Sequence, residues 1–386
     1  MIKEFDKEFV ANTYARFPLA LVSGKGSLVY DDNGKEYIDL GTGIAVNTFG
    51  IGDDDWKKAI INQLDKIQHT SNLYYSEPCA ILAKLLCEMT GMKKVFFSNS
   101  GAEANECAIK AARKYGENVK GEGYTTIITL KNSFHGRTLT TLAATGQDTF
   151  HKDFLPLTEG FVYADANDIE QVKKLCAENK VCAVMFEVVQ GEGGVNPLDK
   201  DYLLALSELA KEQDILLVAD EVQIGNGRSG ELYGYMNFGI TPDIVSTAKG
   251  LAGGLPIGAT LLGEKVKDVY TPGLHGSTFG GNPVSCAAAI SVISRIDQKL
   301  LDDVKEKSKY IFDELNGAKG VKSVSGLGLM LGIETERDAS AVIAECMEAG
   351  VLVIKAKNKV RMLPALNIEW KELKKAIKVF KEVCAK

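Results

Sequence analysis

The sequence predicts an α/β protein whose central sheet is mostly parallel, followed by a smaller α+β part. Apolar runs rich in β-branched residues alternate with helical patterns through the middle of the chain, at residues 95–97, 126–130, 181–189, 215–219 and 244–247. This alternation is typical of strands joined by crossover helices. Several of these runs are apolar at consecutive positions, which indicates strands that helices cover on both faces.

The two ends of the chain show other patterns. Residues 24–50 predict hairpins, with strands at 27–30 and 36–40 around an Asp-Asp-Asn-Gly turn. After about residue 275 the pattern predicts helices at 300–315 and 370–383, with short strands at 329–333 and 351–354. We therefore expect an N-terminal segment, 1–55, that is part of a small domain, a large domain, 56–274, and a C-terminal small domain, 275–386.

Composition excludes several classes of protein. The 45 basic and 51 acidic residues give a formal charge of −6 without long blocks of one sign, so we expect no nucleic-acid partner. The eight cysteines form no C-x-x-C pair and only four histidines accompany them, so we expect reduced thiols and no metal site. The charged N-terminus does not resemble a signal peptide, and no apolar stretch is long enough to cross a membrane. These features favour a cytoplasmic location.

Ligands of open α/β sheets bind at the carboxyl ends of strands, and three predicted strand ends carry reactive or polar side chains. The first is Ser98-Asn99-Ser100-Gly101-Ala102, which leads into an alanine-rich helix. Small residues at a helix N-terminus let backbone N–H groups approach an anion, which suits a phosphate. An ordinary Ser/Asn helix cap explains this local sequence nearly as well.

The other two strand ends carry an acid and a lysine. Asp220 follows a very apolar run, where a carboxylate needs a cation or hydrogen-bond donors; a capping aspartate is the alternative. Lys249 follows another apolar run and precedes glycines, and a desolvated amine of this kind suits Schiff-base chemistry; a solvated loop lysine is the alternative. The combination of the three strand ends favours a functional site.

Two glycine-rich segments invite a different interpretation. Residues 225–230 match G-x-G-x-x-G after a strand, but residues 231–239 show no helical pattern and the position about twenty residues later is Gly250, not an acid. We therefore do not expect a dinucleotide site there. The near-match at 326–332 continues as a strand, so it is predicted to be a turn.

Six segments together resemble the class III (ornithine-type) PLP aminotransferases, in the same order, over roughly residues 14–366. They are SNSGAEANECAIKAAR, NSFHGRT, FEVVQGEGGV, LLVADEVQ, TAKGLAGGLPIGA and HGSTFGGNP. The resemblance implies the type I (aspartate aminotransferase-like) fold of PLP enzymes, with a large domain and a small α+β domain. Within the class, NSFHGRTL with the following ATGQ, and residues 273–283, are most similar to the N-acetylornithine aminotransferases.

The resemblance implies how pyridoxal 5′-phosphate (PLP) would be held. Lys249 would form the Schiff base, and Asp220 would pair with the protonated ring nitrogen. Gln223 would hydrogen-bond the ring hydroxyl, and Phe134 would stack on the ring.

The resemblance also implies how the phosphate would be bound. Ser100, Gly101 and Ala102 would hold it from one subunit. Thr278, with Ser277 beside it, would reach it from the partner subunit of a homodimer, so the active site would lie at the subunit interface.

Substrate carboxylates require further residues, and arginine binds them in a bidentate way that lysine cannot reproduce. The resemblance assigns Arg137 to the α-carboxylate of an acetylated diamino acid and Arg361 to a carboxylate of glutamate or 2-oxoglutarate. Glu192 would cover Arg361 while the bulkier amino donor is bound. Tyr14 matches a tyrosine at the mouth of the substrate site.

Some residues near these motifs receive no chemical role. We expect Glu187 to orient its neighbours, and we assign catalysis to neither His135 nor His275. In the resemblance, Ile44 stands where enzymes for free ornithine tend to have tyrosine, which favours the acetylated substrate. Residues 50–56 depart from the turn usual in the class, so the local structure there is open.

The implied reaction transfers the terminal amino group of N2-acetylornithine to 2-oxoglutarate, giving N-acetylglutamate 5-semialdehyde and glutamate, a step of arginine biosynthesis. Alternatives within the family are transaminases for succinylornithine, succinyldiaminopimelate, ornithine or 4-aminobutyrate. Alternatives outside transamination are an aminomutase or decarboxylase of the same fold, and a non-catalytic PLP-fold binding or regulatory protein. The presence of both Lys249 and Asp220 favours an enzyme.

Overall fold

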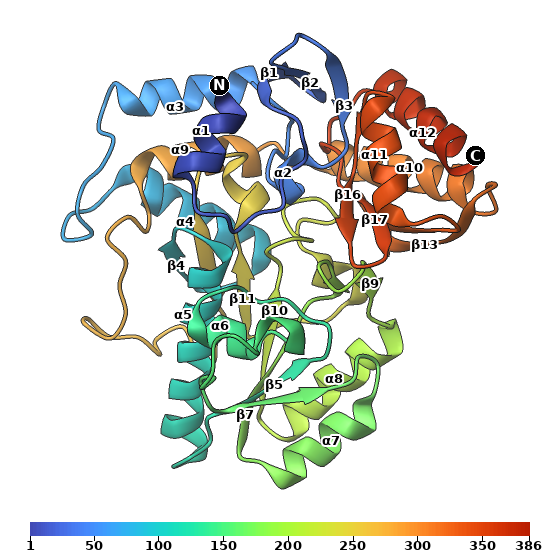
Figure 1. Cartoon of the computed structure of the whole chain (residues 1–386). Helices are drawn as coiled ribbons and strands as arrows, with labels where there is room; N and C mark the ends of the chain where they lie inside the picture. The colour runs from blue at the N-terminus through green and yellow to red at the C-terminus, as the bar shows by residue number, and fades with distance from the viewer.

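The computed structural model describes residues 1–386, and a seven-stranded sheet lies at its centre (Figure 1). Its order is β4 (Lys94–Ser98), β12 (Gly258–Leu262), β11 (Ile244–Thr247), β10 (Leu216–Asp220), β7 (Val181–Phe186), β5 (Thr126–Leu130) and β6 (Phe161–Ala164). Only β12 runs antiparallel to its neighbours, β4 and β11. The predicted mostly parallel sheet is confirmed. The pattern did not predict β12, which follows β11 without a crossover helix, or the partly exposed edge strand β6.

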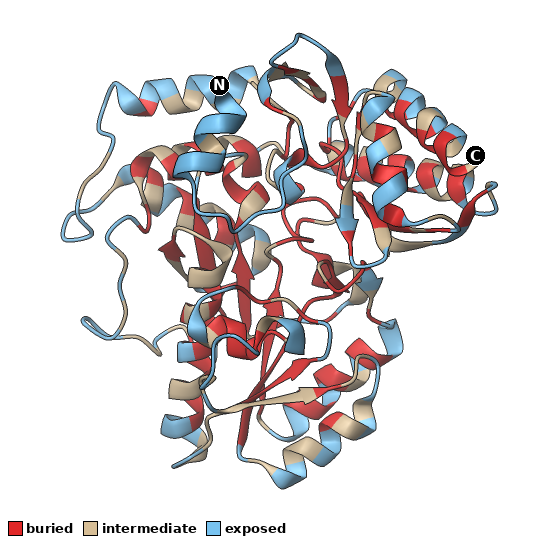
Figure 2. Ribbon diagram, viewed as in Figure 1, coloured by how far each residue is buried: buried red, intermediate tan, exposed pale blue.

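Helices cover both faces of this sheet. Along β10, Leu216 and Val218 pack on the side of α5 (Gly101–Tyr115), whereas Leu217 and Ala219 face the other core. That other core includes α4 (Glu77–Thr90), α7 (Ile169–Glu178), α8 (Lys200–Glu212) and α9 (Pro283–Ile293). The two covered faces explain why the strands are apolar at consecutive positions. Buried residues concentrate along these strands (Figure 2).

A second core lies in the lobe that carries the C-terminus (Figure 1). Its helices are α10 (Gln298–Leu315), α11 (Ala339–Glu348) and α12 (Trp370–Cys384). One sheet has the order β13 (Val321–Leu327), β14 (Met330–Thr335), β17 (Lys359–Met362) and β16 (Ile354–Ala356). The other has the order β1 (Leu21–Lys25), β2 (Leu28–Asp31), β3 (Glu36–Asp39) and β15 (Val351–Leu352). The N-terminal hairpins therefore pack with the C-terminal part. The segment 326–332, which was predicted to be a turn that continues as a strand, contains the turn between β13 and β14 and the start of β14.

Two predicted strands were wrong in extent. The predicted strand 351–354 is divided, because β15 pairs with β3 while β16 pairs with β17 in the other sheet. The predicted strand 181–189 ends at Phe186, and β8 (Val189–Gln190) pairs instead with β9 (Asn196–Pro197). The buried carboxylate of Glu187 accepts hydrogen bonds from the N–H groups of Phe134, at 2.9 Å, and Gly191, at 3.2 Å, so the chain turns there.

The remaining segments are short helices and loops. They include α1 (Ile2–Phe9), α2 (Thr42–Ala45), α3 (Asp54–Leu64) and α6 (Leu139–Ala144). The unusual segment 50–56 starts α3: Asp53 caps it, and the Trp56 indole donates to the Ala252 carbonyl at 2.8 Å. No α-helix follows the glycine-rich segment 225–230, as the pattern of residues 231–239 predicted. The next element is a 3₁₀ helix, Gly234–Phe238.

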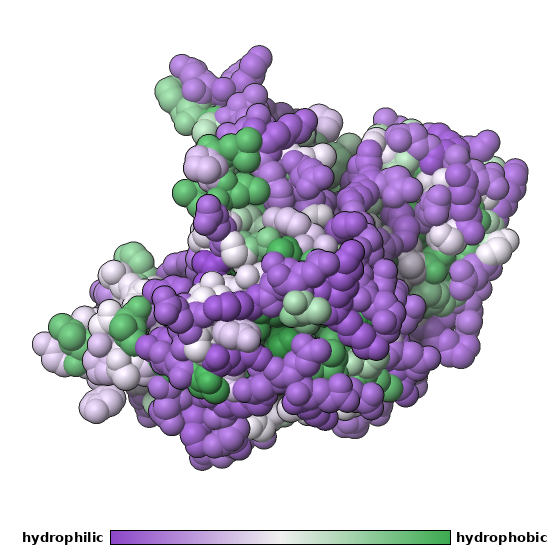
Figure 3. Space-filling view, turned by 90° about the horizontal axis from the view of Figure 1, so that it is seen from below, coloured by the Kyte–Doolittle hydropathy of each residue, from purple (hydrophilic) through white to green (hydrophobic).

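The surface combines charged side chains with apolar groups. Figure 3 shows a face that is mostly hydrophilic, on which apolar side chains gather in separate patches. None of the helices has both the length and the apolar character needed to span a membrane.

Candidate active site

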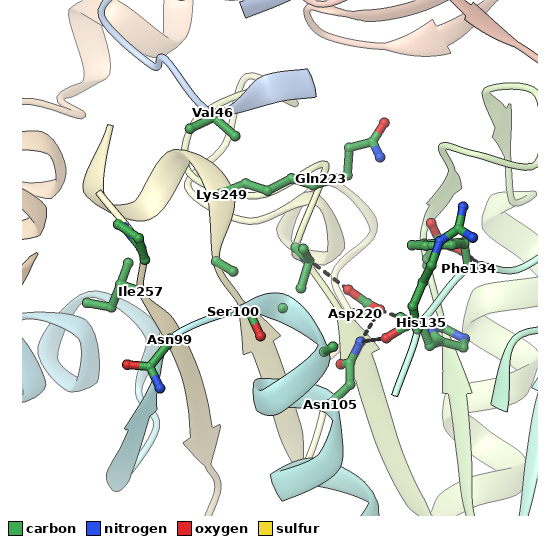
Figure 4. A pocket seen from close by; sticks show the side chains of 18 of the residues that line it. Val46, Asn99, Ser100, Asn105, Phe134, His135, Asp220, Gln223, Lys249 and Ile257 are labelled. Carbon is green, nitrogen blue, oxygen red and sulfur yellow. Dashed lines mark hydrogen bonds and ion pairs between the residues drawn. The ribbon is translucent and has the colours of Figure 1, made fainter. Parts of the chain in front are cut away.

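A cavity of about 440 Å³ lies at the carboxyl ends of the central strands (Figure 4). This volume is within the usual range for small-molecule sites. Eight of the thirteen residues predicted for the site line it: Ser100, Gly101, Ala102, Phe134, Arg137, Asp220, Gln223 and Lys249. The structure therefore brings together predicted residues from four separate segments of the chain.

Lys249 enters the cavity from the turn that follows β11. Its φ of +46° lies in the left-handed region, and a 3₁₀ helix, Lys249–Ala252, starts there. Burial lowers the pKa of Lys249 to about 8, and the positive charge of Arg361 adds to the lowering, whereas Glu192 and Asp220 oppose it. A large fraction of the amine is therefore neutral at mildly alkaline pH, as a nucleophile or base requires.

Asp220, at the end of β10, is held by three donors. Its Oδ2 accepts from the Asn105 amide and from Nδ1 of His135, both at 2.8 Å, and its Oδ1 accepts from the Val222 N–H at 3.0 Å. Asp220 is only 4% exposed, so these bonds offset much of the cost of burying a carboxylate. Figure 4 shows this network along one side of the cavity. The carboxylate is thus fixed in place and oriented before any ligand binds.

Sequence reasoning missed part of this network. It gave His135 no chemical role and did not consider Asn105, although both side chains are buried against Asp220. One signal for Asn105 was present, because it is a polar residue on the buried, alanine-rich face of α5 beside Ala104 and Ala108. His135 had no comparable signal, since its partner lies 85 residues away.

The N-terminus of α5 forms another wall. Ser100 caps the helix, because its Oγ accepts from the Glu103 N–H at 3.2 Å and donates to the Glu103 carboxylate at 3.0 Å. The ordinary helix cap that was the alternative to a phosphate site is therefore present. This cap does not use the N–H groups of Gly101 and Ala102, which have no intrahelical acceptors. A Cβ on Gly101 would lie 2.6 Å from Val222, so only glycine permits this close approach.

Phe134 and Arg137 follow β5 on the opposite side of the cavity. The Phe134 N–H donates to the buried Glu187, whose pKa burial raises to about 7. The Arg137 guanidinium lies over the Phe134 ring at 5.8 Å and over the Phe150 ring at 4.7 Å. Arg137 is exposed, and its guanidinium contacts aromatic rings rather than a carboxylate, so it is available to bind an anion.

Arg361, on β17, lies behind this cavity. Its Nη1 donates to Glu192 at 2.7 Å and to the Gln223 side-chain oxygen at 2.8 Å, and only 2% of Arg361 is exposed. Burial alone would raise the pKa of Glu192, but the charge and hydrogen bond of Arg361 outweigh it and lower the pKa. The Gln223 amide also donates to Glu192 at 3.3 Å, so Gln223 links the cavity to this ion pair.

The remaining predicted residues do not line the cavity of a single chain. Tyr14 is 70% exposed and Thr278 is exposed, while the Ser277 hydroxyl accepts from the Asn99 amide at 3.1 Å. Ile44 lies outside the cavity, and Val46 of the same segment lines it.

The donor set fits PLP, the cofactor that the sequence resemblance implies. Free helix N–H groups match the phosphate, a fixed carboxylate matches a protonated ring nitrogen, and a lysine whose pKa is lowered by burial matches an aldehyde. The Phe134 ring and the Val222 side chain both line the cavity and provide apolar surfaces for a flat ring.

Comparisons with known proteins agree with this geometry. The family described as Aminotransferase class-III matches residues 9–384. The acetylornithine aminotransferase of Haemophilus ducreyi is 51% identical over 384 residues, covering 99% of this chain and 98% of the relative. The N-acetylornithine aminotransferase structure from Stenotrophomonas maltophilia is 34% identical with a TM-score of 0.86, covering 100% of this chain and 98% of that one. An ornithine aminotransferase structure from Toxoplasma gondii is described with partial occupancy of PLP at its active site. It is 31% identical with a TM-score of 0.94, and the match covers 100% of this chain and 94% of that one.

Proposed function

Since the chain belongs to the class-III aminotransferase family, we propose that it transfers the terminal amino group of N2-acetylornithine to 2-oxoglutarate. The products are N-acetylglutamate 5-semialdehyde and glutamate. The expectations of family, type I fold, enzymatic activity and PLP dependence are confirmed by the family match and the related structures. The observation that carries the substrate proposal is the pair of arginines in different states: Arg137 is free, and Arg361 is covered by Glu192.

When bound, PLP supplies the electron sink on which an amino group and a proton are exchanged between donor and acceptor. Lys249 would hold the cofactor covalently and, once released, would carry the proton between carbon atoms, since its lowered pKa suits a base. Asp220 would keep the ring nitrogen protonated, and His135 and Asn105 would keep the carboxylate in position. The N–H groups of Gly101 and Ala102 would bind the phosphate.

Substrate selection would depend on the two arginines. Arg137 would bind the α-carboxylate of the acylated donor, whose other end carries the reacting amine. Glu192 would neutralise Arg361 during this half of the cycle, because the donor has no second carboxylate to replace it. 2-Oxoglutarate has two carboxylates, so one of them would displace Glu192 and pair with Arg361.

A half-reaction tests the substrate. PLP-loaded protein is mixed with N2-acetylornithine without 2-oxoglutarate, and the absorbance band of the bound cofactor is followed. We expect the band to disappear and pyridoxamine phosphate to form faster than with free ornithine or 4-aminobutyrate. A band that persists with N2-acetylornithine but disappears with another donor would keep the aminotransferase and discard this substrate.

We further propose that the chain acts as a homodimer, with Ser277 and Thr278 reaching the phosphate of the partner's site. Large apolar side chains that monomers usually bury are exposed on two neighbouring loops, at Tyr75 (106%) and Phe279 (60%). Helix α1 buries none of its residues although it carries Phe5 and Phe9. Sedimentation equilibrium should give twice the chain mass. Monomeric protein with full turnover would contradict the proposal.

The cellular context is also a proposal. All eight cysteines are free thiols, which supports a reducing, cytoplasmic compartment. Arginine biosynthesis follows as the pathway if N2-acetylornithine is the preferred donor.

A further inference from the structure

The glycine-rich loop 222–230 contains a buried arginine that the reaction described above does not use. Arg228 is 2% exposed and has no acidic side chain within ion-pairing distance. Burial lowers the pKa of Arg228 to about 9. Burying a charge without a counter-ion is unfavourable, and an apolar side chain of similar volume often serves stability as well or better. This arginine therefore requires an explanation other than packing.

Arg228 connects the large sheet's loop to the C-terminal lobe. Its Nη1 donates to the carbonyls of Leu329 and Pro364, both at 2.9 Å, and its own carbonyl accepts from the Leu329 N–H at 2.8 Å. A Cβ on Gly328 would lie 2.2 Å from the Arg228 carbonyl, so the two backbones approach as closely as glycine allows. The loop 222–230 and the C-terminal lobe are therefore held together by side-chain hydrogen bonds and a close backbone contact.

The same loop reaches both halves of the catalytic apparatus. Gln223 accepts from Arg361 at 2.8 Å, and Pro364, which Arg228 contacts, follows Arg361 by three residues. Asn226 donates to the carbonyl of Ala248, the residue before Lys249, at 3.1 Å. The loop thus spans the distance between the Lys249 turn and the end of the strand that carries Arg361.

We propose that Arg228 is a positioning residue for Arg361: by clamping the segment after β17 to the loop 222–230, it sets where the Arg361 guanidinium lies relative to Lys249. This inference rests on the proposed role of Arg361 in binding a dicarboxylate. The guanidinium is planar, so the two N–H bonds of its Nη1 point in fixed directions toward the Leu329 and Pro364 carbonyls. The ammonium of lysine rotates about its stem and does not fix these directions.

The clamp has a selective consequence. Displacement of β17 would move Arg361, the proposed binding residue for dicarboxylates. It would not move Arg137, which follows β5 in the large sheet and is the proposed binding residue for the acylated donor. Loss of the clamp should therefore weaken dicarboxylate binding more than it slows the donor half-reaction. A purely structural role would affect both equally.

The experiment compares Arg228→Lys with Lys307→Met in PLP-loaded protein. Lys307 is a matched control, because it is another buried cation that bonds this segment, donating to the Leu366 carbonyl at 3.1 Å, but it has its own counter-ion, Asp303, at 2.6 Å. The readouts are the inhibition constant of glutarate, an unreactive dicarboxylate, and the rate of the donor half-reaction. We expect Arg228→Lys to raise the glutarate constant about tenfold and to change the donor rate less than about twofold.

Each outcome decides the inference. Equal losses in both readouts, or an equal effect of Lys307→Met on glutarate, would overturn it. If Arg228→Lys does not fold, Arg228→Met replaces it, and failure of both to fold would show a structural role and overturn the inference as well. Arg361→Lys distinguishes a failure of the proposed role of Arg361 from a failure of the proposed role of Arg228. If Arg361→Lys leaves the inhibition constant of glutarate unchanged, the proposed role of Arg361 fails. If Arg361→Lys weakens glutarate binding while Arg228→Lys does not, only the role of Arg228 fails.

Discussion

The Asp220 side and the Arg361 side of the active site are both buried ionic arrangements, but they are built differently. Asp220 accepts three hydrogen bonds from residues that all belong to the large sheet and the helix and loops beside it. Arg361 comes from the C-terminal lobe and meets Glu192 and Gln223 from the other side. The first arrangement lies within one core, whereas the second joins two.

This difference matches the two proposed roles: Asp220 would hold the cofactor throughout the cycle, and Arg361 would bind only one of the two substrates. A carboxylate that pairs with the cofactor gains from being held rigidly, because its partner is the same throughout the cycle. A guanidinium that serves only one of two substrates must exchange its partner, so its ion pair has to break. We therefore expect changes on the Asp220 side to affect every substrate, and changes on the Arg361 side to affect the ratio between substrates.

The largest effect is expected for Lys249→Ala, because Lys249 is the proposed reacting residue on which both the Asp220 side and the Arg361 side depend. Turnover should fall by about 10⁴-fold or more, since the nucleophile and the proton carrier are lost together. The absorbance of the covalently held cofactor should disappear at the same time. A Lys249→Ala protein that still completed multiple turnovers would contradict the assignment.

Asp220→Asn should lower kcat with every donor and acceptor by about 10³-fold, because a neutral amide cannot stabilise a protonated ring nitrogen. Asn105→Ala is the milder comparison, since it keeps the carboxylate and removes one donor, and a loss of about tenfold is expected. Steady-state kinetics with two donors check both variants. A loss of kcat with only one of the two donors would show that the Asp220 side does not affect every substrate.

Glu192→Ala should alter selectivity rather than overall chemistry. Uncovering Arg361 should improve turnover of glutamate relative to the acylated donor by about fivefold. Competition between the two donors measures the ratio directly, and an unchanged ratio would show that Glu192 does not cover Arg361 in the donor half-reaction.

The smallest effect concerns the pH dependence of Lys249. Its neutral form must react with an aldehyde, so the rate at which PLP-free protein captures PLP should rise through a midpoint near pH 8. The negative charge of Glu192 raises this pKa, so Glu192→Gln should move the midpoint to lower pH. A stopped-flow pH series checks it. A midpoint that stays in place would mean that Glu192 and Lys249 are not electrostatically coupled, and a midpoint that rises would contradict the direction of this effect.

Much of the fold was predictable because it depends on local patterns. The strands β5 and β11 have the predicted bounds, since each is a short run rich in β-branched residues. The break at Glu187 was not predictable, because it depends on N–H groups of Phe134 and Gly191 that no local pattern places beside it. Strand β12 was missed for a similar reason: its pairing with β4 joins residues more than 150 positions apart. The three-part domain division stays a prediction.

The candidate site divides in the same way. The prediction that Lys249 and Asp220 carry the chemistry follows from residue type and from their position after apolar strands, because parallel strand ends converge at one edge of a sheet. The pairing of Asp220 with His135 and Asn105, the ion pair between Arg361 and Glu192, and the hydrogen bonds of Arg228 to two carbonyls were decided only by tertiary contacts. The physical reason is that an apolar pattern reports which side chains leave water, whereas the partner that satisfies a buried polar group is set by distance in three dimensions.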